Sequence, residues 1–257
     1  MVIYMNFYID FEATQFDNKI ISIGCINDVG DTFYSLVKPK EDVKVTKFIT
    51  QLTGITKEMI DNAPSADEVF SKFGDFITSH NYGQPTFFFC YDKADQIFLT
   101  STAKYVKDRD VKNFMNCLAG SLIDYSIPTK EFFKASSVGV KKALNYFRKE
   151  PVIQRHDALE DADMLRELYW YINTAKEEAL EECPFEECGK PNKNSEKYEG
   201  AVVSEGDKFD TLDEAVDFVL ENLMPNNGAS RVSVKKKIRW AINNNKEYFL
   251  RKWKKGE

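Results

Sequence analysis

The N-terminal part of the chain consists of apolar runs separated by short polar turns. Residues 2–14 begin with a nearly continuous apolar and aromatic run, which is typical of a buried central strand. Two further segments, Lys19–Asn27 and Thr32–Val37, are rich in β-branched and apolar residues and flank the turn-forming sequence Asp28–Asp31. This pattern predicts three successive strands joined by short turns.

After residue 46 the apolar positions recur at the spacing of helices. Pro64 and Ser65 divide the stretch 46–80 into two predicted helices, and Ser65 with Glu68 matches an N-terminal capping box. The continuous apolar run Pro85–Tyr91 then predicts a buried strand. The chain therefore changes from strands to helices and back to a strand.

The elements that follow are predicted to be mostly helical. Helical patterns cover Asp95–Val106, Ser136–Phe147, with serines as caps, and His156–Ala175. Residues 107–134 are ambiguous, because helical spacing is combined with a segment, Ser121–Ser126, that could form a short strand. Together these elements predict an α/β fold with a mixed sheet and flanking helices.

Composition divides the chain into three parts. Residues 1–175 are predicted to form the α/β domain. Residues 176–206 are rich in acidic residues and poor in large apolar ones, which predicts a linker or spacer. Residues 207–257 are predicted to form a small, basic, mainly helical module, with Lys235–Arg239 beside Trp240 among its charges.

The overall composition limits the classes of protein that come into question. With 257 residues and a formal net charge of -6, the chain can bury a sizeable core but does not favour nucleic-acid binding over its whole surface. Its five cysteines are odd in number, so we expect reduced thiols in a cytoplasmic protein. Cys183 and Cys188 lack the second pair of ligands that a structural zinc site needs. No cleavable signal and no membrane-spanning apolar stretch is expected.

Two carboxylates stand at alternate positions where the first apolar run ends. On a strand, Asp10 and Glu12 leave on the same face, where they repel each other unless a cation lies between them. A divalent metal ion is the natural cation for such a pair. The alternative is an edge strand that carries two solvated acids.

A second group of polar residues surrounds the start of the last long helix. His156 precedes Asp161 by five residues, and both side chains can face one cleft if the histidine lies at or before the helix start. The small Ala158 and Ala162 allow this helix to approach a sheet closely. Carboxylates that hold Mg²⁺ or Mn²⁺, with a histidine as base, suit metal-assisted hydrolysis of phosphodiesters. The alternative for a single histidine here is a cap or surface residue.

These motifs together resemble the DEDDh branch of the DnaQ-like 3′-5′ exonucleases, which have an RNase H-like fold. The resemblance covers most of residues 1–175, and Asp10–Thr14 is most similar to the Eri-type RNA exonucleases. Leu52–Met59 with Ala63-Pro64 is similar to the family's L-x-G-I-T segment and following A-P, and Ser35–Pro39 is similar to its third strand. Asp92 and Asp95 both follow the predicted strand Pro85–Tyr91. The family's spacing selects Asp95.

The resemblance implies a role for each matching residue. It implies a two-metal site that binds Mg²⁺ or Mn²⁺, with His156 as the general base. It also implies a pocket for the terminal nucleotide beside the D-x-E motif. The implied metal ligands are Asp10, Glu12, Asp95 and Asp161, and the implied substrate-binding residues are Ala13, Thr14, Phe16 and Ile55. Asp157, Glu160 and Asp163 are expected to be solvated helix charges.

The expected activity is 3′-5′ exonuclease cleavage of single-stranded DNA or RNA. The alternative is a non-catalytic nucleic-acid-binding subunit or a polymerase-associated subunit of the proofreading type. The basic C-terminal module could bind nucleic acid or dock a protein partner. Nothing in the sequence selects DNA or RNA, because no single residue reveals contacts to the 2′-hydroxyl.

Overall fold

The computed structural model of the chain describes residues 4–40, 43–149, 151–175, 180, 183–185, 201–203, 207–209 and 217. The chain divides into two units, of which the first comprises residues 1–13, 18–43 and 57–189 and the second residues 14–17, 44–56 and 190–257. The first unit contains β1 (Met5–Ala13), β2 (Ile20–Asn27), β3 (Thr32–Leu36), α2 (Lys57–Asp61), α3 (Ala66–His80), β4 (Thr86–Cys90), α4 (Ala94–Ala103), α5 (Arg109–Ser121), β5 (Leu122–Asp124), α6 (Ser126–Phe132), α7 (Val140–Arg148) and α8 (Ala158–Thr174). The second unit contains α1 (Lys47–Thr53), β6 (Ala201–Val203) and β7 (Asp207–Phe209).

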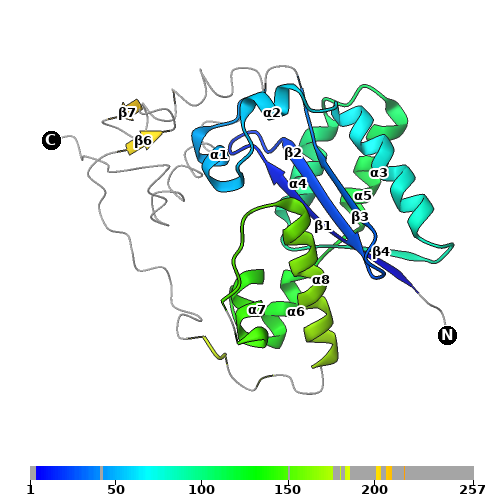
Figure 1. Cartoon of the computed structure of the whole chain (residues 1–257), viewed down its shortest axis with the longest axis vertical. Helices are drawn as coiled ribbons and strands as arrows, with labels where there is room; N and C mark the ends of the chain where they lie inside the picture. The colour runs from blue at the N-terminus through cyan, green and yellow to red at the C-terminus, as the bar shows by residue number, and fades with distance from the viewer. Residues whose placement is uncertain are drawn as a thin grey trace. The chain divides into compact units, whose positions relative to one another are not determined.

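The first unit is built on a five-stranded sheet in the order β3-β2-β1-β4-β5, with β1 between β2 and β4 (Figure 1). β1, β2 and β3 pair antiparallel, whereas β4 pairs parallel with β1 and β5 parallel with β4. The central position of β1 explains its nearly continuous apolar run, since both of its faces are covered. The predicted α/β fold with a mixed sheet is confirmed, as is the hairpin across Asp28–Asp31.

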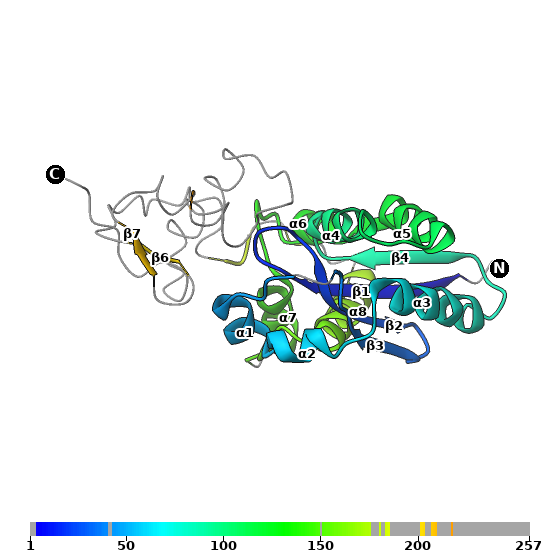
Figure 2. The same ribbon diagram turned by 90° about the horizontal axis from the view of Figure 1, so that it is seen from above.

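Side chains of β1 alternate between two cores on opposite faces of the sheet. Phe7, Ile9 and Phe11 belong to a core formed with α3, α4 and α5, of which α4 and α5 lie side by side (Figure 2). Tyr8 belongs to the other core, formed with α6, α7 and α8. Because strand side chains alternate, Asp10 and Glu12 share the face of Tyr8 and α8.

The start of α8 lies directly against β2. A Cβ atom added at Gly24 would lie 2.2 Å from backbone atoms of Ala158 and Leu159. Gly24 pairs with Asp10 in the sheet, so this contact places the helix start beside the acidic end of β1. Ala158 and Ala162 are fully buried, which confirms the prediction that small residues let the helix approach the sheet.

Three details of the helices differ from the predicted pattern. The stretch 46–80 contains three helices, because Gly54 takes a left-handed conformation (φ 75°) that ends α1. α7 begins after Gly139 without any side-chain cap, so the prediction of serine caps is wrong. The helix α6 was not predicted. The capping box between Ser65 and Glu68 is confirmed at the start of α3.

β4 is less buried than its apolar run predicts. Phe87 is exposed and contacts the Tyr4 ring, with the ring centroids 5.0 Å apart. Only the last part of the strand, Phe89 and Cys90, is buried. The prediction of a strand is therefore confirmed, but the prediction that it is buried throughout is wrong.

The C-terminal third of the chain is described at few positions. β6 and β7 form an antiparallel pair that was not predicted, and Asp217 is helical. Most of the predicted spacer 176–206 and of the predicted basic module 207–257 lies outside the described residues.

The described cysteines include both free thiols and a disulfide-bonded residue. Cys25, Cys90 and Cys117 are free thiols, as expected. Cys183 is part of a disulfide, so the prediction of five reduced thiols is wrong at this residue, and Cys188 lies outside the described residues. Within the part of the chain that the structure describes, no helix is long and apolar enough to cross a membrane.

Candidate active site

The central strand carries two acids toward α8. Asp10 pairs with Gly24 and Glu12 with Ser22, and the register shifts between Glu12 and Ala13. Glu12 is buried, with 8% of its surface exposed. The acids therefore lie on a central strand rather than on a solvated edge, which settles the alternative that the sequence left open.

The start of α8 is fixed by a cap next to the predicted histidine. Asp157 Oδ1 accepts hydrogen bonds from the backbone N–H groups of Leu159 and Glu160, each at 3.0 Å. Asp157 is thus the N-cap of α8, and the prediction of a solvated helix charge is wrong for this residue. Because the helix begins at Ala158, Asp161 stands in its first turn, where it is buried.

His156 lies between the two acid-bearing elements. Its backbone has a φ of 54°, a left-handed conformation, immediately before the cap. Its Nδ1 is 4.0 Å from Glu12 Oε1 and 4.0 Å from Asp161 Oδ2. One ligand atom of each of these three residues lies within 4.8 Å of the others, so together they could hold a metal ion.

Asp161 has two differently placed oxygens. Oδ2 accepts a hydrogen bond of 2.9 Å from Nε2 of Gln154. Oδ1 is buried and has no hydrogen-bond partner among the described residues. A buried carboxylate oxygen without a partner is costly in the isolated protein, and a cation would satisfy it. Sequence reasoning missed Gln154, because no motif marks it.

The structure distinguishes the two aspartates that follow β4. Asp95 is buried in the first turn of α4, and its charge raises the pKa values of both Asp10 and Glu12. Asp92 is exposed in the turn before α4, with a φ of 127°. The Asp95 carboxylate therefore interacts electrostatically with Asp10 and Glu12 of β1.

The pKa values of all four acids are raised above their usual values. Burial is the main cause for each of them, and the neighbouring carboxylates add to it. The pKa of Glu12 is raised to about 9 by burial, then by Asp161 and Asp95. Burial and Asp92 raise the pKa of Asp95 to about 8. The pKa of Asp10 is also raised well above its usual value. Such a set of buried oxygen donors fits a hard divalent cation.

The predicted substrate-binding residues fall in both units. Ala13 is the last residue of β1, next to Glu12. Thr14, Phe16 and Ile55 are buried residues of the second unit. Within that unit, Gln15 Oε1 accepts a hydrogen bond of 2.9 Å from the Thr46 hydroxyl at the start of α1.

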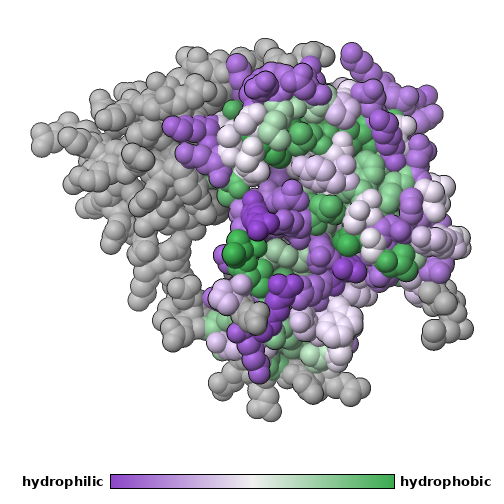
Figure 3. Space-filling model, in the orientation of Figure 1, coloured by the Kyte–Doolittle hydropathy of each residue, from purple (hydrophilic) through white to green (hydrophobic). Residues whose placement is uncertain are grey.

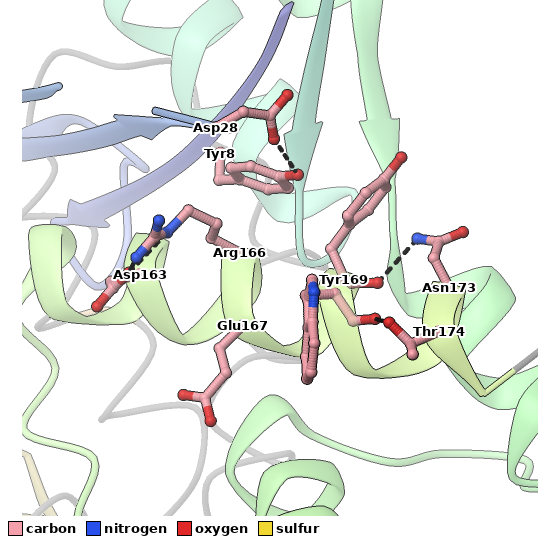
Figure 4. A pocket seen from close by; sticks show the side chains of 9 residues that line it. Tyr8, Asp28, Asp163, Arg166, Glu167, Tyr169, Asn173 and Thr174 are labelled. Carbon is pink, nitrogen blue, oxygen red and sulfur yellow. Dashed lines mark hydrogen bonds and ion pairs between the residues drawn. The ribbon is translucent and has the colours of Figure 1, made fainter. Parts of the chain in front are cut away.

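A separate pocket lies along α8. It has a volume of about 510 Å³, and its lining includes Tyr8, Asp28, Arg166 and Trp170 (Figure 4). Tyr8 donates a hydrogen bond of 2.9 Å to Asp28 there. None of the predicted catalytic residues lines it.

Elsewhere, hydrophilic and hydrophobic residues are interspersed over the face seen in Figure 3.

The mixed sheet, with acids on its central strand and on the helix across it, is an arrangement typical of nucleases with an RNase H-like fold. The family model of exonucleases, RNase_T, matches residues 7–169. The chain therefore belongs to this exonuclease family, and the resemblance to DnaQ-like DEDDh exonucleases is confirmed. Membership of the family implies dependence on divalent metal ions and a nucleic-acid substrate.

Two curated relatives are each similar to part of the chain. A PolC-type DNA polymerase III of Caldanaerobacter subterraneus subsp. tengcongensis is 28% identical over 173 residues, which are 62% of this chain and 11% of that protein. The ERI1 exoribonuclease 2 of Danio rerio is 35% identical over 68 residues, 26% of this chain and 12% of that protein. The chain thus spans about a tenth of the length of these relatives.

A solved structure has the same fold. The nuclease domain of 3′hExo, a DEDDh family member, bound to rAMP, superposes with a TM-score of 0.58 at 20% sequence identity. The match covers 69% of this chain and 96% of that chain. The likeness supports the RNase H-like architecture of the first unit.

Proposed function

We propose that this chain is a divalent-metal-dependent 3′-5′ exonuclease that acts on single-stranded DNA or RNA. The observation that carries the proposal is the grouping of Glu12, His156 and Asp161 within 4.8 Å. The half-buried Asp10 interacts electrostatically with Glu12, Asp161 and the buried Asp95. These residues come from three elements that are far apart in the sequence. Buried acids that repel one another are retained where a cation offsets their charge.

The carboxylates are the proposed metal ligands. Asp10, Glu12, Asp95 and Asp161 offer oxygen atoms, and oxygen ligands favour Mg²⁺ or Mn²⁺ over zinc. Two such ions would supply activation of the attacking water and stabilisation of the leaving oxygen. The carboxylates that would hold them lie near the end of β1 and in the first turns of α4 and α8.

His156 is the proposed general base. Its Nδ1 is the ring nitrogen measured at 4.0 Å from both Glu12 and Asp161, so a water beside these carboxylates is within its reach. With an unperturbed pKa of about 6.5, a histidine can accept a proton near neutral pH. Its partly exposed side chain allows the proton to pass on to solvent.

The terminal nucleotide is proposed to bind beside the end of β1. Ala13, Thr14, Phe16 and Ile55 are the proposed contacts, carried over from the family resemblance. The apolar side chains of Ala13, Phe16 and Ile55 and the hydroxyl group of Thr14 suit contacts to a base and a sugar rather than to phosphate charge.

The 257-residue chain is expected to shorten a 5′-labelled single-stranded oligonucleotide stepwise in Mn²⁺. Asp10→Ala should remove a proposed metal ligand and His156→Ala the proposed base, and we expect each to lower the rate by at least about 100-fold. The control is Asp163→Asn, because Asp163 is exposed on α8 and pairs with Arg166. Gel analysis of the products gives both rate and polarity.

Two results would contradict the proposed activity. Equal cleavage by wild type and both variants would assign the activity to a contaminant. Tight binding of the oligonucleotide without metal-dependent cleavage would favour the non-catalytic alternative.

The predicted division of the chain also belongs to this proposal. Residues 1–175 form the nuclease domain, 176–206 the spacer, and 207–257 a basic module that binds the nucleic acid. The support is the run Lys235–Lys237 beside Arg239 and Trp240, which offers phosphate attraction and a stacking surface.

Deletion of residues 201–257 is expected to weaken binding of single-stranded oligonucleotides and to make it less salt-dependent, with cleavage chemistry retained. Each lost phosphate contact should reduce the slope of log K against log salt by about 0.7. Fluorescence anisotropy over a salt series measures both quantities. Replacing Lys235, Lys236 and Lys237 by Gln in the full chain is the matched variant, and an unchanged slope in both proteins would exclude a role for this module.

A further inference from the structure

The segment that carries His156 is anchored along its length. It connects α7 to α8, and its Val152 is buried and donates its backbone N–H to Asn145 Oδ1 of α7 at 2.6 Å. At its other end Asp157 caps α8. Between these anchors Ile153 is 72% exposed, whereas Gln154 turns to a buried partner.

Gln154 joins this segment directly to a proposed metal ligand. Its Nε2 donates to Asp161 Oδ2 at 2.9 Å, across seven residues of sequence. The same Oδ2 is 4.0 Å from Nδ1 of His156. The hydrogen bond therefore holds the Asp161 carboxylate and the His156 segment in fixed positions relative to each other. The oxygen that accepts it is the one that lies near the His156 ring.

The bond also separates the roles of the two carboxylate oxygens. With Oδ2 occupied by an N–H donor, Oδ1 is the buried oxygen that has no hydrogen bond among the described residues. A hydrogen bond to one oxygen limits rotation of the carboxylate, so the other oxygen is presented in a fixed position. The arrangement is that of a ligand held ready for a cation.

The chemistry of the donor fits this role. A lysine or arginine at this position would pair with Asp161 and offset the negative charge that attracts the metal. An amide donates a hydrogen bond without adding a charge, so it orients the carboxylate and leaves the electrostatic attraction intact.

We propose that Gln154 is a positioning residue that orients Asp161 for divalent-metal binding and holds the His156 segment beside it. This inference rests on the proposed metal-dependent activity. Gln154 acts through Asp161 and does not touch the nucleic acid, so its removal should change metal affinity and kcat more than KM for the oligonucleotide.

The test compares Gln154→Met with Ile153→Ser in the full chain. Methionine is close to glutamine in size but donates no hydrogen bond, whereas Ile153 is exposed in the same segment. Mn²⁺ binding is titrated without substrate by electron paramagnetic resonance of the free ion. We expect Gln154→Met to weaken Mn²⁺ binding by about 10-fold or more and Ile153→Ser to leave it unchanged. In cleavage assays at fixed Mn²⁺, kcat should fall while KM stays within about twofold, and excess Mn²⁺ should restore part of the rate.

Equal Mn²⁺ affinity in wild type and Gln154→Met would overturn the inference. If Gln154→Met melts far below wild type without metal, Gln154→Asn decides the question, because it keeps an amide that is one methylene too short to reach Asp161 with the same geometry. The affinity ratio can be measured even if the wild type cleaves no oligonucleotide. In that case the proposed function fails, but the ratio of Mn²⁺ affinities still shows whether Gln154 positions Asp161 for metal binding.

Discussion

Glu12→Gln is expected to eliminate cleavage and, at the same time, to stabilise the metal-free protein. Burial, followed by Asp161 and Asp95, raises the pKa of Glu12 to about 9, so its ionised form is unfavourable in the folded state. Glutamine keeps the shape and removes the charge. At pH 8 without metal we expect a gain on the order of 2 kcal/mol, which corresponds to roughly 4–8 °C in unfolding midpoint.

The direction of the pH dependence follows from the raised pKa. In the unfolded chain a glutamate titrates at about 4.3. Below that pH the carboxyl is protonated in both states and its stabilising contribution is fully present. As the pH rises from about 4 toward about 9, the unfolded state releases the proton first and the contribution is lost. The stability difference between Glu12→Gln and wild type should therefore grow from pH 5 to pH 8.

Thermal melts at pH 5 and pH 8, with EDTA or Mn²⁺, measure this effect. Mn²⁺ should raise the midpoint of the wild type by mass action and that of Glu12→Gln much less. The control is Glu160→Gln, because Glu160 is exposed and pairs with Arg155 at 3.0 Å. A Glu12→Gln midpoint below that of wild type at pH 8 in EDTA would mean that the carboxylate is stabilised by the protein alone.

Much of the first unit could be predicted because its signals are local. The apolar run of β1, the turn at Asp28–Asp31 and the capping box at Ser65 each depend on neighbouring residues in the sequence. The two acid motifs were visible for the same reason, since Asp10 and Glu12 differ by one strand period. His156 and Asp161 flank a helix start that the pattern also located to within a few residues.

The features that sequence reasoning missed depend on contacts between distant segments. Gln154 has no motif, and its partner became evident only when the bond to Asp161 was seen. The assignment of Asp95 rather than Asp92 rested on spacing, whereas burial separates them physically. Gly24 looked like an ordinary strand residue, although it determines how closely α8 approaches the sheet.

Gly24→Ala is expected to disrupt both stability and cleavage. The new Cβ would lie 2.2 Å from the carbonyl carbon and oxygen of Ala158 and from the backbone nitrogen of Leu159. Backbone atoms cannot move aside by changing rotamer, so the start of α8 must shift away from β2. Overpacking of this kind costs about 1–3 kcal/mol or more.

The shift would reach the proposed site because α8 carries Asp161 in its first turn and follows His156 directly. A displacement of about 1 Å in catalytic groups can cost about 100-fold in rate. Gly120→Ala is the matched control, since Gly120 is an exposed helical glycine with no atom within 4 Å of its added Cβ, and it should gain about 0.5–1 kcal/mol. Denaturant unfolding and oligonucleotide cleavage measure the two effects. If Gly24→Ala kept wild-type stability and rate, the close contact between α8 and β2 would not be what positions Asp161.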